Sequence, residues 1–389
     1  MIAEFVLLAI GLAGSLMFVL GLIQVPFAVS AIVGVVLAGV LGRRASGGRG
    51  RPPLHPLATV ITIVPLLVIA FDSVVVPLHD FDGRLFWTLK AKALAHERRI
   101  DGPFFRGESV FDPRNQYPLL LPLDDAAIMM ATRSLDTENV RWLYAALFAA
   151  FVFHVRNKLA RFVEPSIAAW CAAILAWVPQ FAVVEEGGAL SAYSDIGVAA
   201  FTAAAFFELV ERRSPLRFGL WLAFLTLTKN EGLAIAIVFL ILGIFAFRWS
   251  VARAAVPLAI VVAALFDWRH RVPITDEEAT LSLLPTLPQH LGRFALAVTT
   301  FLGHTVIGSH WGLLWFVAIA ALALLAWRRE WEAPAVVVSV MGVYIVVYMV
   351  TLWNMRDLVD ATADRLLMHV IGPALFAIAR VSGPTAQNR

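Results

Sequence analysis

The chain has 389 residues, of which 60% are hydrophobic and only 15% are charged. A soluble domain usually carries about 25% charged residues, so this composition excludes an ordinary soluble protein. The mean hydropathy of +0.79 and the long apolar runs predict an all-α polytopic membrane protein, and short alternating strands typical of a β-barrel are not found. The net charge of +3 comes mostly from short basic tracts between apolar runs, which argues against a nucleic-acid partner. The single Cys171 excludes a disulfide framework.

Apolar runs that approach the length of a bilayer crossing recur along the whole chain. We expect about twelve transmembrane helices. They are predicted at 2–22, 24–41, 57–77, 139–157, 166–183, 193–211, 217–229, 232–248, 253–267, 311–327, 334–351 and 365–380. The first run is too long for a signal peptide and no basic residues precede it, so we expect a retained helix. We divide the chain into two extra N-terminal helices with a basic loop (1–56), a main transmembrane domain (57–380) and a short loose tail (381–389).

Basic tracts between the runs predict the topology. They lie at Arg43/Arg44/Arg49/Arg51, Arg156/Lys158/Arg161, Arg212/Arg213/Arg217, Arg248/Arg253 and Arg328/Arg329. If all are cytoplasmic, both termini lie inside and the run at 288–308 cannot cross, so we interpret it as an interfacial helix. Three segments then lie outside: a long loop at 78–137, an acidic turn at Glu185–Glu186, and a loop at 268–290.

The first outer loop is predicted to contain helices. Residues 84–98 place an apolar set on one helical face, with Lys90 elsewhere, which is typical of a helix lying on the membrane surface. That apolar set is Leu85, Phe86, Leu89, Ala93 and Leu94. A second helix is expected from Asp124 and Asp125, after Pro118 and Pro122.

Asp80 and Asp82 follow the third run and would lie at the outer membrane surface. Such a carboxylate can deprotonate an acceptor hydroxyl or bind a divalent cation, although an Asp before a helix is also an ordinary N-cap. Trp87 and Lys90 are neighbours on the expected helix, which pairs an aromatic face suited to a sugar ring with an ammonium suited to phosphate.

The segment Thr228-Lys-Asn-Glu-Gly232 predicts a buried polar site. A helix that starts at Arg217 reaches Lys229 after about 18 Å, which is short of the roughly 30 Å of bilayer hydrocarbon. Lys229 and Glu231 should therefore lie at a helix break below the outer surface, lined by protein or water. The alternative is that the two form a structural ion pair with each other.

Further charged residues are expected on the same side. Asp195 opens the run at 193–211 and Glu186 precedes it by a short turn. Arg365 and His369 are four apart, so on one helix they would share a face that can hold phosphate. Helix capping, an exposed turn and a snorkelling Arg are the alternatives. His304 and His310 do not have convincing metal-ligand spacing, and we expect no metal site there.

Five segments together resemble the bacterial integral-membrane glycosyltransferases of the GT-C class. They are Asp82-Gly-Arg-Leu-Phe-Trp-Thr-Leu-Lys-Ala-Lys-Ala-Leu, Tyr117-Pro-Leu-Leu-Leu-Pro, Tyr193-Ser-Asp, Leu227-Thr-Lys-Asn-Glu-Gly and Asp364-Arg-Leu-Leu-Met-His. The class includes mannosyltransferases and other users of polyprenyl-phosphate sugars, and the resemblance covers residues 57–380. It implies a GT-C-like helix bundle in the bacterial inner membrane with a site on the extracytoplasmic side. It also implies a lipid-phosphate-linked sugar donor, membrane lipids as surroundings, and an acidic base in the first outer loop, which maps to Asp82.

The resulting hypothesis assigns a role to each residue. Asp82 is the expected base, with Asp195 as the second candidate. Lys229, Arg365, His369 and Lys90 would hold the donor phosphate, and Trp87 would support the sugar or the first isoprene. Glu231 would orient Lys229. Supporting roles are expected for Asp80, Glu186 and Tyr117. The acceptor can be a glycan, a lipid or a protein in cell-envelope assembly, and no cofactor is required apart from a possible divalent cation.

Other functions place charged residues inside a membrane bundle as well. A transporter or lipid flippase would do so, and it predicts related halves with paired broken helices. A non-catalytic scaffold predicts that the charged segments tolerate neutral substitution. An enzyme that transfers a group other than a sugar from a polyprenyl carrier would share all these features.

Overall fold

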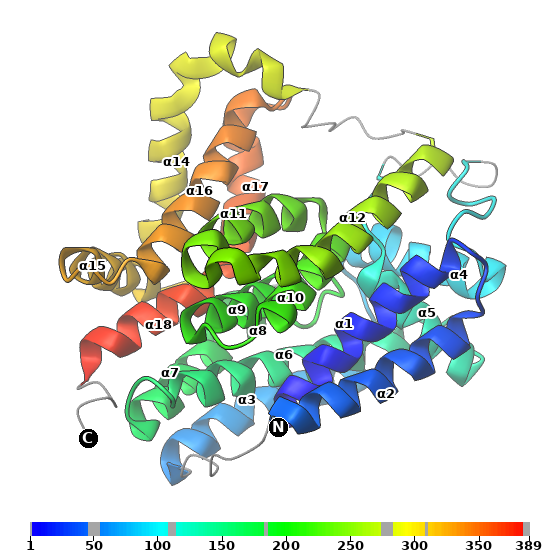
Figure 1. The fold of residues 1–389 in the computed structure, drawn as a ribbon, viewed down its shortest axis with the longest axis horizontal. Coiled ribbons are helices and arrows are strands. Elements are labelled where there is room, and N and C mark those ends of the chain that lie inside the picture. The colour runs from blue at the N-terminus through cyan, green and yellow to red at the C-terminus, as the bar shows by residue number, and fades with distance from the viewer. Residues whose placement is uncertain are drawn as a thin grey trace.

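The computed structural model describes residues 2–45, 55–107, 114–182, 186–273, 283–307 and 310–383, and within these ranges the regular structure is helical with no strand (Figure 1). The α-helices are α1 Ile2–Gly21, α2 Phe27–Ala45, α3 Pro56–Val75, α4 Thr88–Glu97, α5 Leu120–Thr132, α6 Glu138–Leu159, α7 Pro165–Trp177, α8 Pro179–Ala182, α9 Asp195–Glu211, α10 Pro215–Thr228, α11 Asn230–Phe247, α12 Ala252–Arg271, α14 Phe294–Ile307, α15 Leu314–Trp327, α16 Glu332–Val350, α17 Met355–Met368 and α18 Ile371–Ser382. The prediction of an all-α protein is confirmed for these ranges.

Some expected features lie outside the described residues. They are Arg49 and Arg51 of the basic loop, Glu185, most of the acidic part of the 268–290 loop, and residues 384–389 of the tail. The tail was expected to be loose from residue 381, but α18 continues to Ser382.

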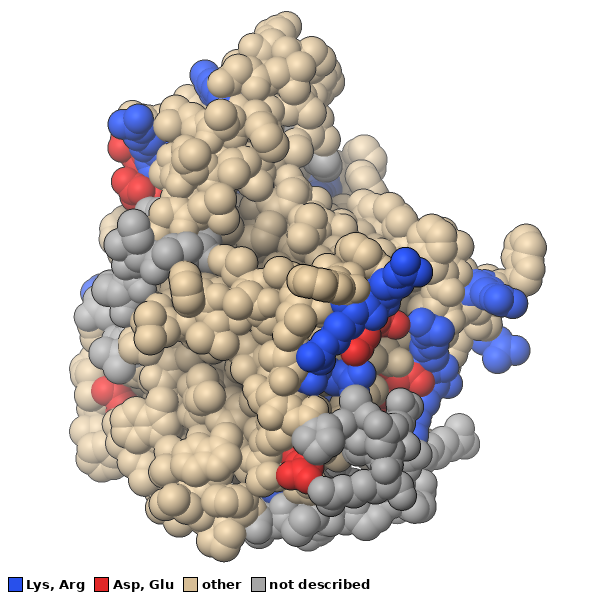
Figure 2. Space-filling model, turned by 90° about the vertical axis from the view of Figure 1, so that its left-hand side faces the viewer, with Lys and Arg blue, Asp and Glu red and all other residues tan. Residues whose placement is uncertain are grey.

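Several helices are apolar enough for a membrane. By length and composition, α1, α3, the continuous stretch Asn230–Arg271 and α16 can each cross a bilayer, and the bent pair α17–α18 makes a fifth candidate. Shorter apolar helices of 10–17 residues include α7, α10 and α15. A membrane-embedded protein is thus compatible with the fold, whereas the full number of about twelve spans stays a prediction. On one face, charged side chains gather in a main patch and a smaller one, with broad uncharged surface between (Figure 2).

The stretch Asn230–Arg271 is a helical hairpin rather than one long helix. Its two halves, α11 and α12, meet at a tight 3₁₀ turn, Arg248–Val251. Near the start of α10, Gly219 lies against Ala254, at the start of α12. At the other end, Arg269 of α12 donates a hydrogen bond of 2.6 Å to the Asn230 side chain, at the start of α11. The two helices therefore run in opposite directions, and each has the length of one crossing.

One end of the bundle, which we call the basic end, collects most of the predicted cytoplasmic tracts. The start of α10 and the ends of α6 and α9 meet there through ion pairs. The pairs are Glu4–Arg217, Lys158–Glu208 (2.9 Å), Lys158–Glu211 (3.0 Å), Arg161–Glu211 (2.5 Å), Arg217–Glu208 (3.3 Å), Arg212–Glu332 (3.2 Å) and Arg380–Glu330 (2.6 Å). Because the α11–α12 turn lies beside the start of α10, the tract at Arg248–Arg253 belongs to the same end. This grouping is what the positive-inside pattern predicts for one membrane face.

Helix α9 lies at the centre of the bundle. Nearly all of its side chains are buried, and it packs against α6, α10, α11, α17 and α18. Its many alanines, such as Ala199, Ala200 and Ala203, allow neighbouring helices to approach closely. Asp195, the first residue of α9, is thereby placed at the end of the bundle opposite the basic end, where the other candidate residues gather (Figure 1).

Several predicted elements differ in the structure. The helix expected from Asp124 begins at Leu120, and the run 166–183 is interrupted at Val178 between α7 and α8. The helix expected over 84–98 begins with a π-helical turn, Gly83–Trp87, followed by α4. This wider turn shifts the buried face, so that Leu85 is exposed whereas Lys90, expected on the polar face, is fully buried. The segment 288–308 consists of a 3₁₀ segment, Leu284–Arg293, and α14. Its position relative to a membrane stays a prediction.

Candidate functional site

The helix break predicted at Lys229 is present. α10 ends at Thr228 and α11 begins at Asn230, and Lys229 between them is fully extended, with φ −159° and ψ 160°. The extended backbone turns the Lys229 side chain into the protein, where Nζ lies 2.9 Å from Asp195 and 3.2 Å from Glu231. The alternative of a simple Lys229–Glu231 pair is therefore incomplete, because Asp195 is the shorter contact.

Asp195 is the centre of the buried network. It is fully buried, and its Oδ1 accepts hydrogen bonds from Lys229 Nζ and, at 3.1 Å, from His369 Nε2. Because a carboxylate only accepts, Nε2 carries the ring proton. In the neutral ring, Nδ1 then accepts a bond of 2.6 Å from the Tyr344 hydroxyl of α16. Tyr344 was not predicted from the sequence, and its position within an apolar run gives no signal.

The last predicted span, 365–380, is wrong as a single helix. The chain forms α17, which ends at Met368, and α18, which begins at Ile371, and the two are bent by 57°. Pro373 in the first turn of α18 lacks the N–H that would bond the carbonyl of His369, so the helical ladder is interrupted there. His369 is the residue after α17, where its backbone is still helical, and its ring points to Asp195, whose charge also interacts with Arg365.

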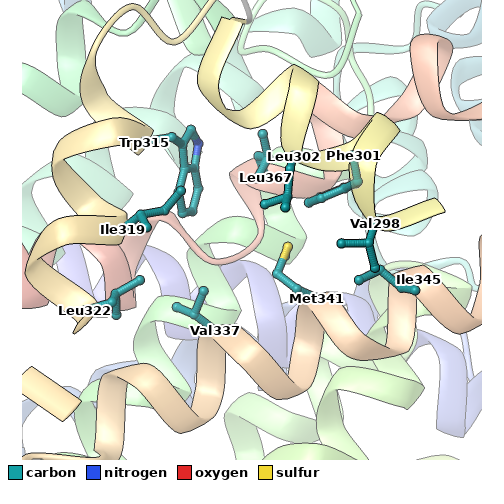
Figure 3. Close-up of a pocket in the computed structure, with 10 residues that line it drawn as sticks. All are labelled: Val298, Phe301, Leu302, Trp315, Ile319, Leu322, Val337, Met341, Ile345 and Leu367. Carbon is teal, nitrogen blue, oxygen red and sulfur yellow. The ribbon is translucent and has the colours of Figure 1, made fainter. Parts of the chain in front are cut away.

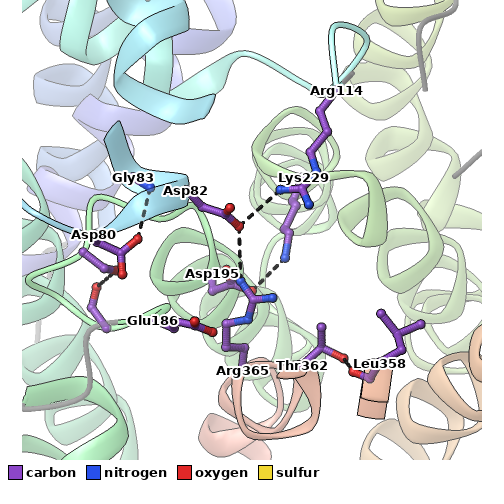
Figure 4. A network of polar contacts seen from close by, with 12 residues as sticks. Asp80, Asp82, Gly83, Arg114, Glu186, Asp195, Lys229, Leu358, Thr362 and Arg365 are labelled. Atoms are coloured by element: carbon purple, nitrogen blue, oxygen red, sulfur yellow. Dashed lines mark hydrogen bonds and ion pairs between the residues drawn. The ribbon is translucent and has the colours of Figure 1, made fainter. Parts of the chain in front are cut away.

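Arg365 links the buried network to the first outer loop. Its guanidinium lies 5.3 Å over the Tyr193 ring, and NH1 lies 3.9 Å from Asp82 Oδ2. Arg114, which was not predicted, contacts the same Asp82 oxygen at 3.2 Å (Figure 4). Gly187 lies beside the Arg365 side chain at φ +86°, a left-handed conformation that favours glycine. The structure thus brings Asp82, Arg365, Asp195 and Lys229 together at one end of the bundle.

The Asp80–Gly83 turn is anchored from both sides. Asp80 accepts a 3.2 Å hydrogen bond from the Gly83 N–H and a further one from the Tyr193 hydroxyl. A side chain at Gly83 would collide with the Ser191 carbonyl, so only glycine permits this approach. Burial raises the pKa of the Asp80 carboxyl above its ordinary value, and the two hydrogen bonds oppose that shift. Asp80 is therefore a structural anchor that fixes the position of Asp82.

Three aromatic side chains pack together beside the charged network. The Trp87 and Tyr117 rings are stacked with centroids 5.9 Å apart, and together with Tyr193 they form a separate buried cluster. Lys90 Nζ lies 5.4 Å from the Tyr117 ring and donates to the Arg114 carbonyl. Trp87 and Lys90 are therefore close together as predicted, but the buried Lys90 supports the loop segment at Arg114.

Asn230 and Gln116 join the first outer loop to the α11–α12 hairpin. Gln116 Nε2 donates to the carbonyls of Arg269 at 3.1 Å and Val272 at 2.7 Å, while Arg269 bonds Asn230. This contact holds the segment with Arg114 and Tyr117 over the Lys229 break. It gives Asn230 in the sequence Thr228-Lys-Asn-Glu-Gly232 a positioning role that sequence reasoning did not identify.

The remaining candidates lie at the edge of the site. Glu186 is exposed, and its charge acts on Asp80 and Arg365. Asp364 points away to His310 Nδ1, 3.0 Å distant. In the described part of the chain, no three His, Cys, Asp or Glu side chains gather as metal ligands would, so we derive no step through a divalent cation.

Comparison of this chain with family models, with curated proteins and with solved structures returns no match.

Proposed function

We propose that the chain is a membrane glycosyltransferase of the GT-C type. It transfers a sugar from a polyprenyl-phosphate donor to an acceptor hydroxyl, in cell-envelope glycan assembly. The observation that carries the proposal is the convergence on one end of the bundle of a loop carboxylate, Asp82, with the buried cluster Asp195–Lys229–His369, through Arg365. Lys229 and His369 of that cluster lie where helices are interrupted. Interrupted backbone and charged side chains are both unfavourable inside a membrane bundle, so they are expected where a polar ligand binds.

The chemistry requires one base and a place for a phosphate. A bond forms between the acceptor oxygen and the sugar's anomeric carbon, while the bond from that carbon to the donor phosphate oxygen breaks. The phosphate leaves with the electron pair as a stable anion, and the acceptor proton passes to a carboxylate. We assign the proton to Asp82, which is partly accessible, whereas Asp195 is fully buried and engaged by two donors. In this assignment Asp195 positions Lys229 and His369.

The donor phosphate is assigned to the cationic groups that adjoin Asp82 and Asp195. Arg114 and Arg365 contact Asp82 at 3.2 and 3.9 Å, which is looser than the 2.5–3.0 Å of the main pairs at the basic end. Guanidinium groups held loosely in this way can exchange a carboxylate for a phosphate, which they bind in a bidentate manner. Lys229 stays on Asp195 and adds positive charge, and Glu231 orients it.

Apolar and aromatic surfaces next to the charges suit the other parts of such a donor. An apolar cavity of about 130 Å³ lies between α14, α15 and α16, and its lining includes Trp315, Met341 and Leu367 (Figure 3). Leu367 of α17 belongs to this lining, and we assign the first isoprene units of the donor to the cavity because it is wholly apolar. The Trp87–Tyr117 stack is assigned to the sugar, because aromatic faces suit the apolar faces of sugar rings.

The topology proposed for this function follows the predicted one. The basic end faces the cytoplasm of a bacterial inner membrane, the chain crosses about twelve times, and the site faces the extracytoplasmic side. The shorter apolar helices would reach the required length only with their flanking residues.

The direct test uses the full chain in lipid nanodiscs with a radiolabelled polyprenyl-phosphate hexose and bacterial membrane extract as the acceptor source. Transfer of label from the donor into extract, absent with heat-inactivated protein, supports the proposal. If polyprenyl-phosphate mannose, other hexose donors and pentose donors all remain intact under the same conditions, the proposal is contradicted.

A transporter or lipid flippase is the second candidate, and one observation favours it. The structure contains two interrupted helices, at Lys229 and at His369, and both interruptions meet at Asp195. Paired helix breaks at a common polar site are what a transporter predicts. Proteoliposomes loaded with the same labelled donor and with membrane extract as the acceptor source separate the two functions. A transporter moves intact donor between leaflets, whereas the enzyme leaves the donor's distribution unchanged and transfers its sugar to the acceptor.

A further inference from the structure

A second cavity is lined in part by Asp80. Its volume is about 320 Å³, within the range of small-molecule sites. The polar end is formed by Asp72, Asp80 and Arg141, and the apolar end by Val68, Ala182 and Leu190. Of the candidate residues, only Asp80 lines this cavity, and Asp82 lies two residues along the same segment.

The charges of this cavity disfavour an anionic ligand. Arg141 is almost fully buried and is already committed, since NH2 lies 2.7 Å from Asp72 Oδ1 and 3.2 Å from the Leu190 carbonyl, and NH1 also bonds backbone carbonyls of the α3 end. The remaining carboxylate, Asp80, has no cation among these contacts. His79 and Ser191 also line the cavity, but even a protonated His79 would only balance Asp80, so the cations do not outnumber the carboxylates that a phosphate headgroup would face. Uncharged hydroxyl groups, in contrast, can donate to these oxygens.

The apolar end opens toward the surface that a bilayer would cover. Val68 is 62% exposed and lies on α3, one of the helices long and apolar enough to cross a membrane. Its neighbours Val64, Leu67 and Phe71 are also exposed, so the outer face of α3 is a continuous apolar surface. A molecule that fills the cavity from this side has a hydrocarbon part beside α3 and a polar head near Asp80.

We propose that this cavity binds the acceptor, and that the acceptor is a lipid with an uncharged, hydroxyl-bearing headgroup such as a sugar. The proposal rests on the glycosyltransferase function above and names its acceptor class. It places the acceptor lipid in this cavity with its headgroup beside Asp80, so that the reacting hydroxyl extends past Asp80 toward Asp82 and the donor sugar. Asp82, two residues along the same segment, is then the carboxylate that both substrates can approach.

The experiment uses the full chain in nanodiscs with two clickable diazirine lipids that share the same acyl chains, a glucosyl diacylglycerol and a phosphatidylglycerol. After illumination, labelled peptides are mapped by mass spectrometry. The glucosyl lipid should label the end of α3 and the 186–191 segment about tenfold more than the anionic lipid. Val68→Trp and Ala182→Phe, which crowd the cavity, should each lower that labelling by about tenfold.

Leu67→Trp is the matched control, because Leu67 is 63% exposed on the same helix but does not line the cavity. It should leave labelling unchanged. Equal labelling by both lipids, no labelling at these segments, or labelling that neither cavity variant lowers would overturn the proposal. The readout needs no sugar transfer, so selective labelling without any transfer would remove the glycosyltransferase function while leaving a neutral-lipid site.

Discussion

The two ends of the bundle both bury charged side chains, but in different ways. At the basic end, Lys158, Glu208 and Glu211 lie on regular last turns of α6 and α9, and their contacts are 2.9–3.0 Å. At the site end, Lys229 and His369 lie where helices are interrupted. Lys229 contacts Asp195 at 2.9 Å, and Asp82 lies 3.2 Å from Arg114 and 3.9 Å from Arg365, so the two ends differ in their backbone rather than in the length of every contact.

This difference separates charges that hold helices together from charges available to a ligand. A pair between intact helix turns is complete and needs no third group, so removing one partner leaves an unpaired buried charge. At a helix break, backbone N–H and C=O groups lose their helical hydrogen bonds, which is unfavourable in addition to the buried charge. Such breaks are found in membrane proteins where they line a polar cavity. The comparison predicts that substitutions at the basic end act on stability, whereas those at the site end act on transfer.

The largest expected effect is at the basic end. Lys158→Met removes the cation shared by Glu208 and Glu211 and should lower the unfolding free energy by about 3 kcal/mol, the low end of the range for a broken buried pair, because each carboxylate keeps one arginine, Arg217 or Arg161. Thermal unfolding in detergent measures it. A Lys158→Met variant as stable as the wild type would break the comparison.

A smaller effect is expected for the hydroxyl behind His369. Tyr344→Phe removes the donor to Nδ1 and should cost about 1–3 kcal/mol, with reduced transfer, because the ring loses the group that fixes its orientation toward Asp195. Tyr348→Phe is the control, since Tyr348 is equally buried on α16 but bonds Thr362. Its transfer rate per folded molecule should be unchanged. Equal losses of transfer in both variants would refute a specific role for Tyr344.

A further effect depends on pH and concerns Asp125 on α5, a buried carboxyl whose partner is the Tyr144 hydroxyl at 2.9 Å. Burial raises the pKa of Asp125 from 3.8 to about 8. Because the folded state then binds the proton more tightly, this group stabilises the fold fully below about pH 4, and that contribution is lost as the pH rises to about 8. Melting curves at pH 5, 6, 7 and 8 should show that Asp125→Asn loses less stability with rising pH than the wild type. If the stability of Asp125→Asn and of the wild type falls equally with rising pH, the assignment of this pH dependence to Asp125 is contradicted.

Hydropathy predicted most helices and the break at Lys229, because an apolar run interrupted by Lys229 and Glu231 cannot continue unbroken through a membrane. It did not predict the bend after α17, since the signal is the single Pro373, whose missing N–H matters only once the helix is known. The placement of Lys90 on the polar face of 84–98 was wrong, since a π-helical turn changes the residue spacing and Lys90 is buried. Arg114 and Tyr344 reach the site by tertiary packing alone, which a periodicity does not encode.

The central claim, that Asp82 is the base of a sugar-transfer site, is tested most directly by Asp82→Asn in nanodiscs with a labelled polyprenyl-phosphate hexose. Asp101→Asn is the control, because Asp101 lies in the same loop and contacts Arg99 at 3.2 Å, outside the site. The account predicts that Asp82→Asn lowers the transfer rate about 10²–10⁴-fold while donor binding persists, and that Asp101→Asn has no such effect. Transfer by Asp82→Asn at the wild-type rate would contradict the account.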